Sequence, residues 1–214
     1  MIKFQRIVIG VIVLAAFLPA QKKSYWTLEA FLGSAKSIAT PLSIHQYGEE
    51  RIHLIARYNT RPFVGSPYYS YRISKWSKNR SWEFELVHHK LYLSNPPDEV
   101  QQFNISHGYN LITVNRAWLR RGFIMRVGAG IVATHPETTI RGKTLLWEKG
   151  FDGFYISGIT LQVAAGKKFT IWGKFFGVLE AKFTTSYAVI PIQDGNAYVP
   201  NVAFHGLFGL GIEL

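Results

Sequence analysis

The sequence predicts an all-β fold: a closed antiparallel transmembrane β-barrel of eight to ten strands, ten being the best count, with a side-chain-filled lumen. Three observations support this fold class. Apolar side chains alternate with small or polar ones up to the last residue. The composition is 48% hydrophobic and 15% aromatic, yet beyond residue 20 no apolar stretch approaches the roughly 20 residues that a membrane-spanning helix needs. There is no cysteine, so packing or strand closure must supply the stability.

The closing segment, Val202 to Leu214, has the clearest two-residue period. One face is apolar, and the other is small or polar and includes His205, Gly209 and Gly211. Chain ends usually fray, whereas a barrel in a bilayer needs its last strand paired on both edges and apolar on the outside. We therefore expect this segment to be the strand that closes the barrel.

The amino terminus resembles a secretory signal peptide. Lys3 and Arg6 precede an apolar run of twelve residues, Ile7 to Leu18, and a polar segment follows Ala20. Twelve residues are too few for a membrane-spanning helix. We expect residues 1–20 to be the signal peptide, cleaved near Ala20, and residues 21–214 to be the barrel; an uncleaved anchor is the alternative.

The chain is basic. Removal of Lys3 and Arg6 lowers the formal charge from +11 to +9. The basic residues are scattered through aromatic-rich alternating segments, and an exported chain would not meet DNA, so nucleic acid is not an expected partner. Anionic outer-membrane lipids and lipopolysaccharide phosphates are the expected counterparts.

Turn residues divide the rest of the chain into segments that alternate like strands. Ile38–Gln46 is the weakest, because proline is confined to strand ends and distortions; dropping it and a neighbour gives eight strands. Phe169–Val189 is longer than the roughly 9 to 11 residues that cross a bilayer, so it should extend beyond the membrane or be interrupted. The ten segments are Trp26–Leu32, Ile38–Gln46, Ile52–Asn59, Tyr69–Ser74, Trp82–Leu86, Gln102–Trp118, Gly122–Thr134, Tyr155–Val163, Phe169–Val189 and Val202–Leu214.

The connections fall into two length classes. Leu93–Val100 and His135–Gly150 are long, while the expected tight polar turns are Tyr47–Glu50, Ser77–Arg80, Leu119–Arg121 and Ala165–Lys168. Short turns at one end and long loops at the other are typical of outer-membrane barrels, with both termini on the periplasmic side.

The last seven residues, Phe208 to Leu214, look like a barrel-assembly signal, with Leu214 in place of the usual aromatic residue. The mature chain thus resembles the small outer-membrane β-barrel proteins of Gram-negative bacteria. This resemblance is one of architecture, so it implies insertion by the barrel-assembly machinery and an outer-membrane location, and no particular activity.

The polar faces distinguish this barrel from a soluble one. A lipid-binding periplasmic barrel would place its apolar face inward and charges outward. Here the polar faces mix both signs of charge with small residues, which suits an ion-pair network inside the lumen. Its expected members are Glu29, Arg57, Arg72, Glu83, Glu85, Arg126, Glu180 and Lys182.

Two histidines are the candidates for chemistry. Because side chains alternate along a strand, His107 shares one face with Phe103, Ile105, Tyr109 and Leu111, and we expect that face to meet lipid. By the same alternation, His88 and Lys90 continue the outward face of Trp82. Polar groups are costly there unless they lie near head groups.

One interpretation of these histidines is acyl hydrolysis or transfer at the membrane surface, with His107 or His88 as base and a serine such as Ser106 as nucleophile. The lipid A deacylases are small barrels that work there, but their His-x-Ser spacing is absent and no acid partner is evident. The other interpretation is contact of Lys90, His88 and His107 with head groups. No residue pattern predicts a metal site or a cofactor.

The sequence thus supports three functions. The first is a non-enzymatic outer-membrane barrel acting in envelope integrity, surface interaction or handling of a small hydrophobic ligand. The second is a lipid A-modifying acyl hydrolase or acyltransferase at the outer leaflet. The third is a soluble periplasmic lipid-binding barrel.

Overall fold

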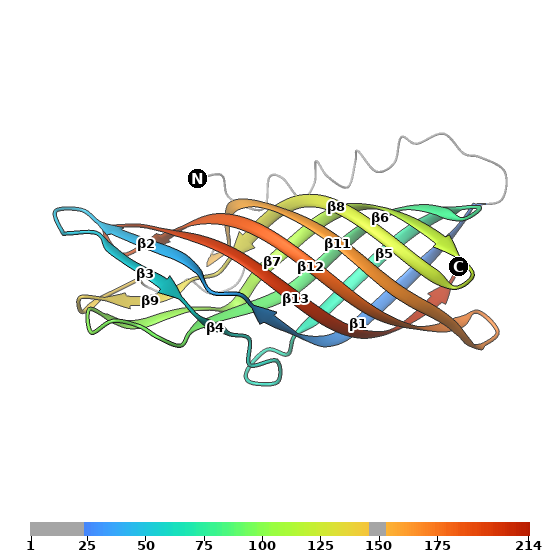
Figure 1. The fold of residues 1–214 in the computed structure, drawn as a ribbon, viewed down its shortest axis with the longest axis horizontal. Coiled ribbons are helices and arrows are strands. Elements are labelled where there is room, and N and C mark those ends of the chain that lie inside the picture. The colour runs from blue at the N-terminus through green and yellow to red at the C-terminus, as the bar shows by residue number, and fades with distance from the viewer. Residues whose placement is uncertain (1–23, 146–152) are drawn as a thin grey trace.

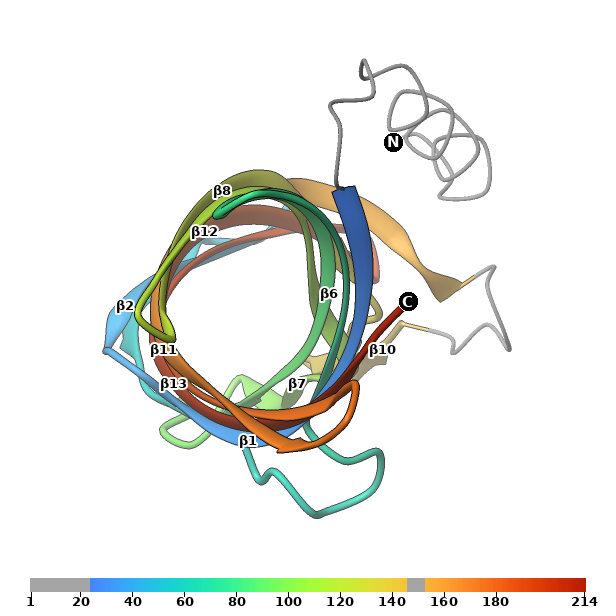
Figure 2. The same cartoon turned by 90° about the vertical axis from the view of Figure 1, so that its right-hand side faces the viewer.

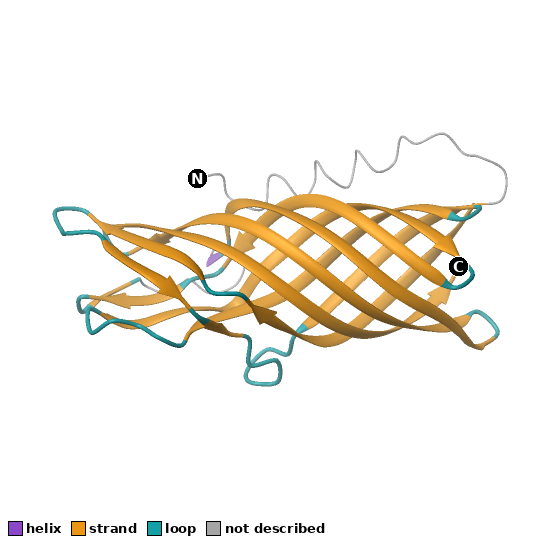
Figure 3. Cartoon of the chain, viewed as in Figure 1, coloured by secondary structure: helices purple, strands orange, loops and turns teal. Residues whose placement is uncertain are grey.

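The fold is known from a computed structural model that describes residues 24–145 and 153–214. The predicted signal peptide, residues 1–20, lies outside these residues. Strands make up most of what is described (Figure 3). No helix among these residues combines the length and the hydrophobicity required to cross a membrane.

Eight strands form a closed antiparallel ring, each hydrogen-bonded to two neighbours, which is the lower end of the predicted range (Figure 2). In ring order they are β1 (Ser24–Ser37), β5 (Tyr69–Ser77), β6 (Arg80–Leu93), β7 (Val100–Arg120), β8 (Phe123–Thr134), β11 (Tyr155–Trp172), β12 (Phe175–Ile192) and β13 (Gly195–Glu213). The closing segment is β13, and it pairs with β1 over eleven positions, from Thr27↔Glu213 to Ser37↔Ala203. The predicted closed barrel is confirmed.

The remaining strands extend the wall beyond the ring at one end. They are β2 (Thr40–Gln46), β3 (Ile52–Ala56), β4 (Tyr58–Asn59), β9 (Glu137–Ile140) and β10 (Lys143–Thr144). Two of the ten predicted barrel strands, Ile38–Gln46 and Ile52–Asn59, belong to this extension. β2 pairs with β3 and with Gly195 to Tyr198 of β13, and among the described strands β3 pairs only with β2. They are strands, as predicted, but they are not among the eight strands of the closed ring.

The two ends of the barrel differ (Figure 1). The short-turn end carries the turns Lys78–Asn79, Arg121–Gly122 and Gly173–Lys174 together with Ser24 and Leu214. The long-loop end carries the connections 38–68, 94–99 and 135–154 and the tight turn Gln193–Asp194. The turn after Tyr47 lies at the long-loop end, because it joins β2 to β3.

One predicted turn is wrong: Ala165–Lys168 lies within β11 and pairs with β12. Phe169–Val189, which was expected to extend beyond the membrane or to be interrupted, is interrupted: it comprises the end of β11, a two-residue turn and most of β12. Gly173 takes a positive φ of 56° there, a conformation that suits two-residue hairpin turns and that glycine adopts without strain. Unbroken alternation across Trp172 to Phe175 concealed this turn.

Charged side chains fill the middle of the lumen, as the polar faces predicted. Arg72 lies 3.0 Å from Glu29, 2.7 Å from Glu85 and 2.7 Å from Glu180. Arg126 lies 2.8 Å from Glu83 and 2.6 Å from Glu180. We call these residues, with Lys182, which lies 2.5 Å from Glu85, the luminal ion network.

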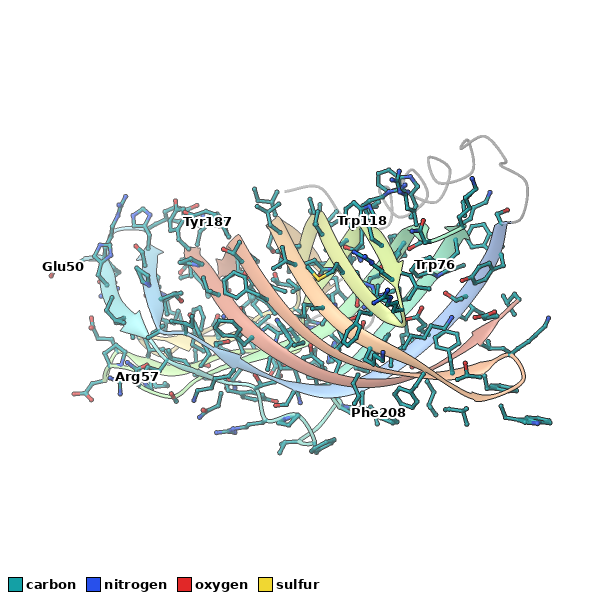
Figure 4. All side chains as sticks on the ribbon, turned by 45° about the vertical axis from the view of Figure 1, so that its right-hand side comes forward. Glu50, Arg57, Trp76, Trp118, Tyr187 and Phe208 are labelled. Carbon is teal, nitrogen blue, oxygen red and sulfur yellow. The ribbon has the colours of Figure 1, made fainter. Side chains whose placement is uncertain are left out.

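One predicted member of that network is wrong. Arg57 is exposed between β3 and β4, and Figure 4 shows it with Glu50 toward the long-loop end. It belongs to the extension, where an outward side chain meets solvent.

Apolar residues close the lumen on either side of the ion network. Toward the short-turn end, Trp76 packs in a cluster with Ala117 and Ile124. Toward the long-loop end lies one large buried apolar cluster, interspersed with buried polar side chains such as His89, Asn201 and His205; the cluster includes Leu42, Ile44, Phe103, Ile105, Ile140, Ile190 and Val199. The lumen is therefore a packed core along its length, not an open channel.

The outward face is apolar over the part of the ring nearer the short-turn end, which we call the lower part. Every one of the eight ring strands exposes at least one large apolar side chain there, and Figure 4 shows Phe208 on the outer wall. One example from each ring strand, with 38% to 56% of its surface exposed, is Leu28, Ile73, Trp82, Val114, Leu161, Val127, Leu179 and Phe208. We call this surface the apolar band.

Polarity inverts above the apolar band. In β7, Val114 and Trp118 point outward, but Phe103, Ile105, Tyr109 and Leu111 are buried inside. The prediction that these four face lipid with His107 is wrong. Parity alone cannot assign the apolar face of a strand that continues beyond the apolar band, because its apolar side there packs inward, as in a soluble sheet.

Candidate functional site

The candidate site lies on the outer wall just above the apolar band, where β6, β7 and β9 meet. Pairing between β6 and β7 shifts here, from His89↔Tyr109 to Leu91↔Ile105. Residues 106–108 of β7 thus bulge opposite Lys90. Such bulges re-aim side chains, and this one turns His107 outward although Ile105 and Tyr109 on either side point inward.

Glycine is required within this bulge. Gly108 has a φ of 137°, which L-residues rarely adopt, and a Cβ atom there would lie 2.3 Å from Nδ2 of Asn110. The backbone carbonyl of Gly108 accepts a hydrogen bond from the amide of His135 at 3.0 Å. The bulge and the start of the next loop are therefore tied together.

Three side chains meet at this bulge: Ser106 and His107, which the sequence predicted, and Glu137, which it did not. Ser106 Oγ donates to Oε1 of Glu137 at 2.6 Å, and the same carboxylate oxygen contacts Nδ1 of His107. Ser106 Oγ also lies 3.4 Å from His107 Nδ1. The His107 side chain is 48% exposed, whereas Glu137 is 22% exposed. We call Ser106, His107 and Glu137 the outer-wall cluster.

Glu137 is the acid partner that the sequence did not reveal. It lies in β9, which pairs with the first residues of β7, so that Asn104 is its cross-strand partner. Thirty residues separate it from His107, and the sequence shows no period or spacing that relates them. Only the return of the 135–154 connection onto β7 brings the carboxylate to the histidine.

Two aromatic rings flank the outer-wall cluster. The His135 ring centroid lies 5.3 Å from that of His107, and Phe154 packs edge-on against His135 at 5.0 Å. The cluster therefore has a partly apolar wall beside it, on the side that faces away from the lumen.

The order of contacts differs from that of a hydrolytic triad. In a triad the imidazole stands between nucleophile and acid and uses a different nitrogen for each. Here serine and carboxylate approach the same nitrogen, Nδ1, and the serine hydroxyl donates directly to the carboxylate. Rotation of the His107 ring is required before a proton could pass from Ser106 through it to Glu137.

The other two predicted site residues have structural partners. His88 Nδ1 lies 2.8 Å from Oδ1 of Asn110, and its ring stacks on Tyr69 at 4.7 Å. Lys90 Nζ donates to the carbonyl oxygens of Val64 at 2.7 Å and Ser66 at 2.6 Å. Lys90 thereby holds the 60–68 loop against the outer wall, and both side chains are buried beneath it.

The height of the cluster follows from strand geometry. Eleven positions of β7 separate His107 from Trp118, an outward aromatic near the short-turn end (Figure 4). At about 3.3 Å per residue and a tilt of about 40°, this separation is roughly 25 Å along the barrel axis. The apolar band of outer-membrane barrels is about 25 Å tall, so the cluster lies at its upper edge.

Comparisons with known proteins add a general likeness. No protein-family profile and no curated protein sequence matches the chain. Among solved structures it is similar to Neisserial surface protein A (NspA), with 10% identity, a TM-score of 0.42 and coverage of 89% of this chain and 97% of that one. It is also similar to Ail, the attachment invasion locus protein of Yersinia pestis, with 10% identity, a TM-score of 0.41 and coverage of 89% and 97%. Ail in complex with the heparin analogue sucrose octasulfate gives 10% identity, a TM-score of 0.43 and coverage of 89% and 99%.

Proposed function

We propose that the chain is an integral outer-membrane β-barrel that conducts no solute and acts through its outward surface and its long-loop end, without catalysis. The observation that carries this proposal is the apolar band. Exposed Leu28, Leu161 and Phe208 would each cost free energy in water, whereas in hydrocarbon they are the favoured side chains. The inward ion network supports the same orientation.

The inversion of polarity supports a defined membrane position. Above the band, Phe103 and Ile105 turn inward, and the outward residues Gln102 and Asn104 are polar. If the bilayer ends at the upper edge of the apolar band, the barrel wall in contact with lipid is apolar and the barrel wall in contact with water is polar. A soluble lipid-binding barrel would instead keep its apolar face inward along the full length of its strands.

The packed lumen argues against transport through the barrel. Arg72 and Arg126 are fully buried, and apolar layers lie above and below them. A small hydrophobic ligand or a surface partner would thus have to bind the outer wall or the long-loop end. Envelope integrity, surface interaction and such ligand handling remain the candidate roles.

Location and closure can be tested together. We expect full-length protein in the outer-membrane fraction, with faster migration in detergent gels before heating than after, because the closed ring stays folded in cold detergent. Reconstituted into planar bilayers, it should leave conductance at the background level. Release by osmotic shock as a detergent-free monomer would contradict the membrane proposal, and discrete channel openings would contradict the closed lumen.

We also propose a second candidate function, acyl-ester hydrolysis or transfer at the outer leaflet, on the strength of the outer-wall cluster. Ser106, His107 and Glu137 are the residue types of a nucleophile, a base and an acid, and they meet at the height of lipid head groups. However, Ser106 and Glu137 contact the same nitrogen of His107 instead of opposite sides of its ring, and this arrangement favours the non-enzymatic function.

Mass spectrometry of lipid A separates the two candidates. If the cluster is catalytic, cells producing the protein should lose or gain an acyl chain on lipid A, and Ser106→Ala or Glu137→Gln should restore the original pattern. His53→Gln, at an exposed histidine on β3, is the matched control. An acylation pattern that is the same with and without the protein would exclude the enzyme.

A further inference from the structure

Positive charge is concentrated at one end of the barrel. Within residues 24–145 and 153–214, the short-turn end has one acidic residue, Glu213, which pairs with Lys168 at 2.6 Å. The long-loop end has nearly balanced charge, with seven basic and six acidic residues. The nine basic residues of the short-turn end, which we call the basic collar, are Lys75, Lys78, Arg80, Arg116, Arg120, Arg121, Lys167, Lys168 and Lys174.

Three collar cations form the same motif with an aromatic residue. Lys75 is the cross-strand partner of Trp26, and its Nζ lies 5.4 Å from the ring centroid. Arg116 is paired likewise with Trp82, with Cζ at 5.1 Å.

The third pair is Lys167 with Phe123, with Nζ at 4.0 Å. The three pairs join β1 to β5, β6 to β7 and β8 to β11, so they are spread around the ring and not gathered at one point. All three rings are outward and lie at the lower edge of the apolar band.

This motif suits a lipid interface. Aromatic rings favour the boundary between hydrocarbon and head groups, and long basic side chains extend from apolar surface toward phosphate. Within the described residues, Lys168 is the one collar cation that has an acidic partner, so anions from outside would offset the mutual repulsion of the others. Zwitterionic lipids bring an ammonium with each phosphate, whereas anionic phospholipids bring net negative charge.

We propose that the basic collar binds anionic phospholipids of the leaflet at the short-turn end, with their phosphates at the Trp26–Lys75, Trp82–Arg116 and Phe123–Lys167 pairs. This inference rests on the proposed membrane location. It also selects between the two partners expected from the sequence, anionic lipids and lipopolysaccharide, because the excess charge lies at the end opposite the long loops, where Ser24 and Leu214 are.

Fluorescence quenching tests the selectivity. The protein is folded into vesicles of phosphatidylcholine with a minor fraction of phosphatidylglycerol, with bromine on the acyl chains of one lipid at a time. We expect bromine on phosphatidylglycerol to quench tryptophan more than its share of the lipid predicts. High salt should reduce this excess, since each cation contributes on the order of fivefold in lipid preference at low salt.

A matched pair of variants identifies the collar. Lys75→Gln/Arg116→Gln/Lys167→Gln should bring quenching by phosphatidylglycerol down to its bulk share. Lys36→Gln/Arg51→Gln/Arg57→Gln, which removes the same charge from the long-loop end, should retain the excess.

The outcomes separate this inference from the membrane proposal. Insertion, shown by quenching with brominated phosphatidylcholine, but no preference for phosphatidylglycerol overturns the collar site alone. No quenching by either lipid overturns the membrane location. Equal quenching by both lipids, with collar-dependent retention on immobilised dextran sulfate, would assign the collar to a polyanion in solution.

Discussion

Arg72→Met is expected to destabilise the folded barrel by about 3 to 5 kcal/mol, the usual cost of removing one partner from a buried ion pair. Arg72 is the centre of the luminal ion network, with carboxylate oxygens of Glu29, Glu85 and Glu180 within 3.0 Å of its guanidinium. Methionine keeps much of the side-chain length but no charge. Four buried carboxylates would then face only Arg126 and Lys182.

Urea unfolding in lipid vesicles, followed by tryptophan fluorescence and gel mobility, measures this loss. Arg80→Met is the matched control, because Arg80 is exposed at the short-turn end, and there we expect a change within about 0.5 kcal/mol. Combining Arg72→Met with Glu180→Gln should recover part of the loss, since it removes one uncompensated carboxylate. An Arg72→Met barrel as stable as the parent would show that the network contributes no stability.

Val127→Arg is expected to cost about 2 to 4 kcal/mol in a bilayer, the range for a cation placed on the lipid face near the midplane. Val127 lies on β8 between Met125 and Ala129, its side chain points outward, and half of its surface is exposed. In water the same substitution would be nearly neutral. The size of the effect therefore measures whether this wall faces hydrocarbon.

Ile55→Arg provides the control for this second substitution. Ile55 is 60% exposed, but it lies on β3 in the extension above the apolar band, where we expect water. Its substitution should leave the free energy of unfolding within about 0.5 kcal/mol. Equal tolerance of both arginines would contradict the assignment of the band to lipid, and equal damage by both would place the extension in the membrane as well.

The hairpin at Trp172 to Phe175 illustrates one limit of sequence patterns. A two-residue turn by itself shifts the odd–even pattern by one position, but the register shift between Thr170 and Trp172 shifts it back, so the same parity continues from β11 into β12 and the two read as one strand. The Gly173–Lys174 pair was the available indication, since glycine favours the positive φ that such turns need. The excessive length of Phe169–Val189 left two alternatives, extension beyond the membrane or an interruption, and the structure shows the interruption.

For two separate reasons, side chains on β7 depart from the pattern that the sequence predicts. The sequence pattern predicts that the apolar residues of β7 face outward. Above the apolar band they face inward instead, so the predicted outward position of Phe103 and Ile105 is wrong. In the same stretch the Gly108 bulge reversed the parity again and left His107 outward. Sequence reasoning therefore placed His107 on the outer wall for a reason that does not hold.

The outer-wall cluster shows the complementary case. The sequence indicates His107 by its expected outward position and Ser106 by residue type, but their acid partner, Glu137, depends on β9 folding back onto the start of β7. A contact between residues 30 positions apart leaves no local trace in a single sequence.

By itself, the sequence determined that this is a closed all-β barrel with charged residues inside and apolar residues outside, because side-chain alternation is a local property written into each strand. It also predicted, from the two-residue period of β13, that this strand closes the ring, and the pairing of β13 with β1 confirms this. Only the tertiary structure decided which strands belong to the closed ring and where polarity inverts, because both depend on strand register around the whole ring. The same register gathers the basic collar at the short-turn end, since cations scattered along the sequence meet only when hairpin turns bring them to one end.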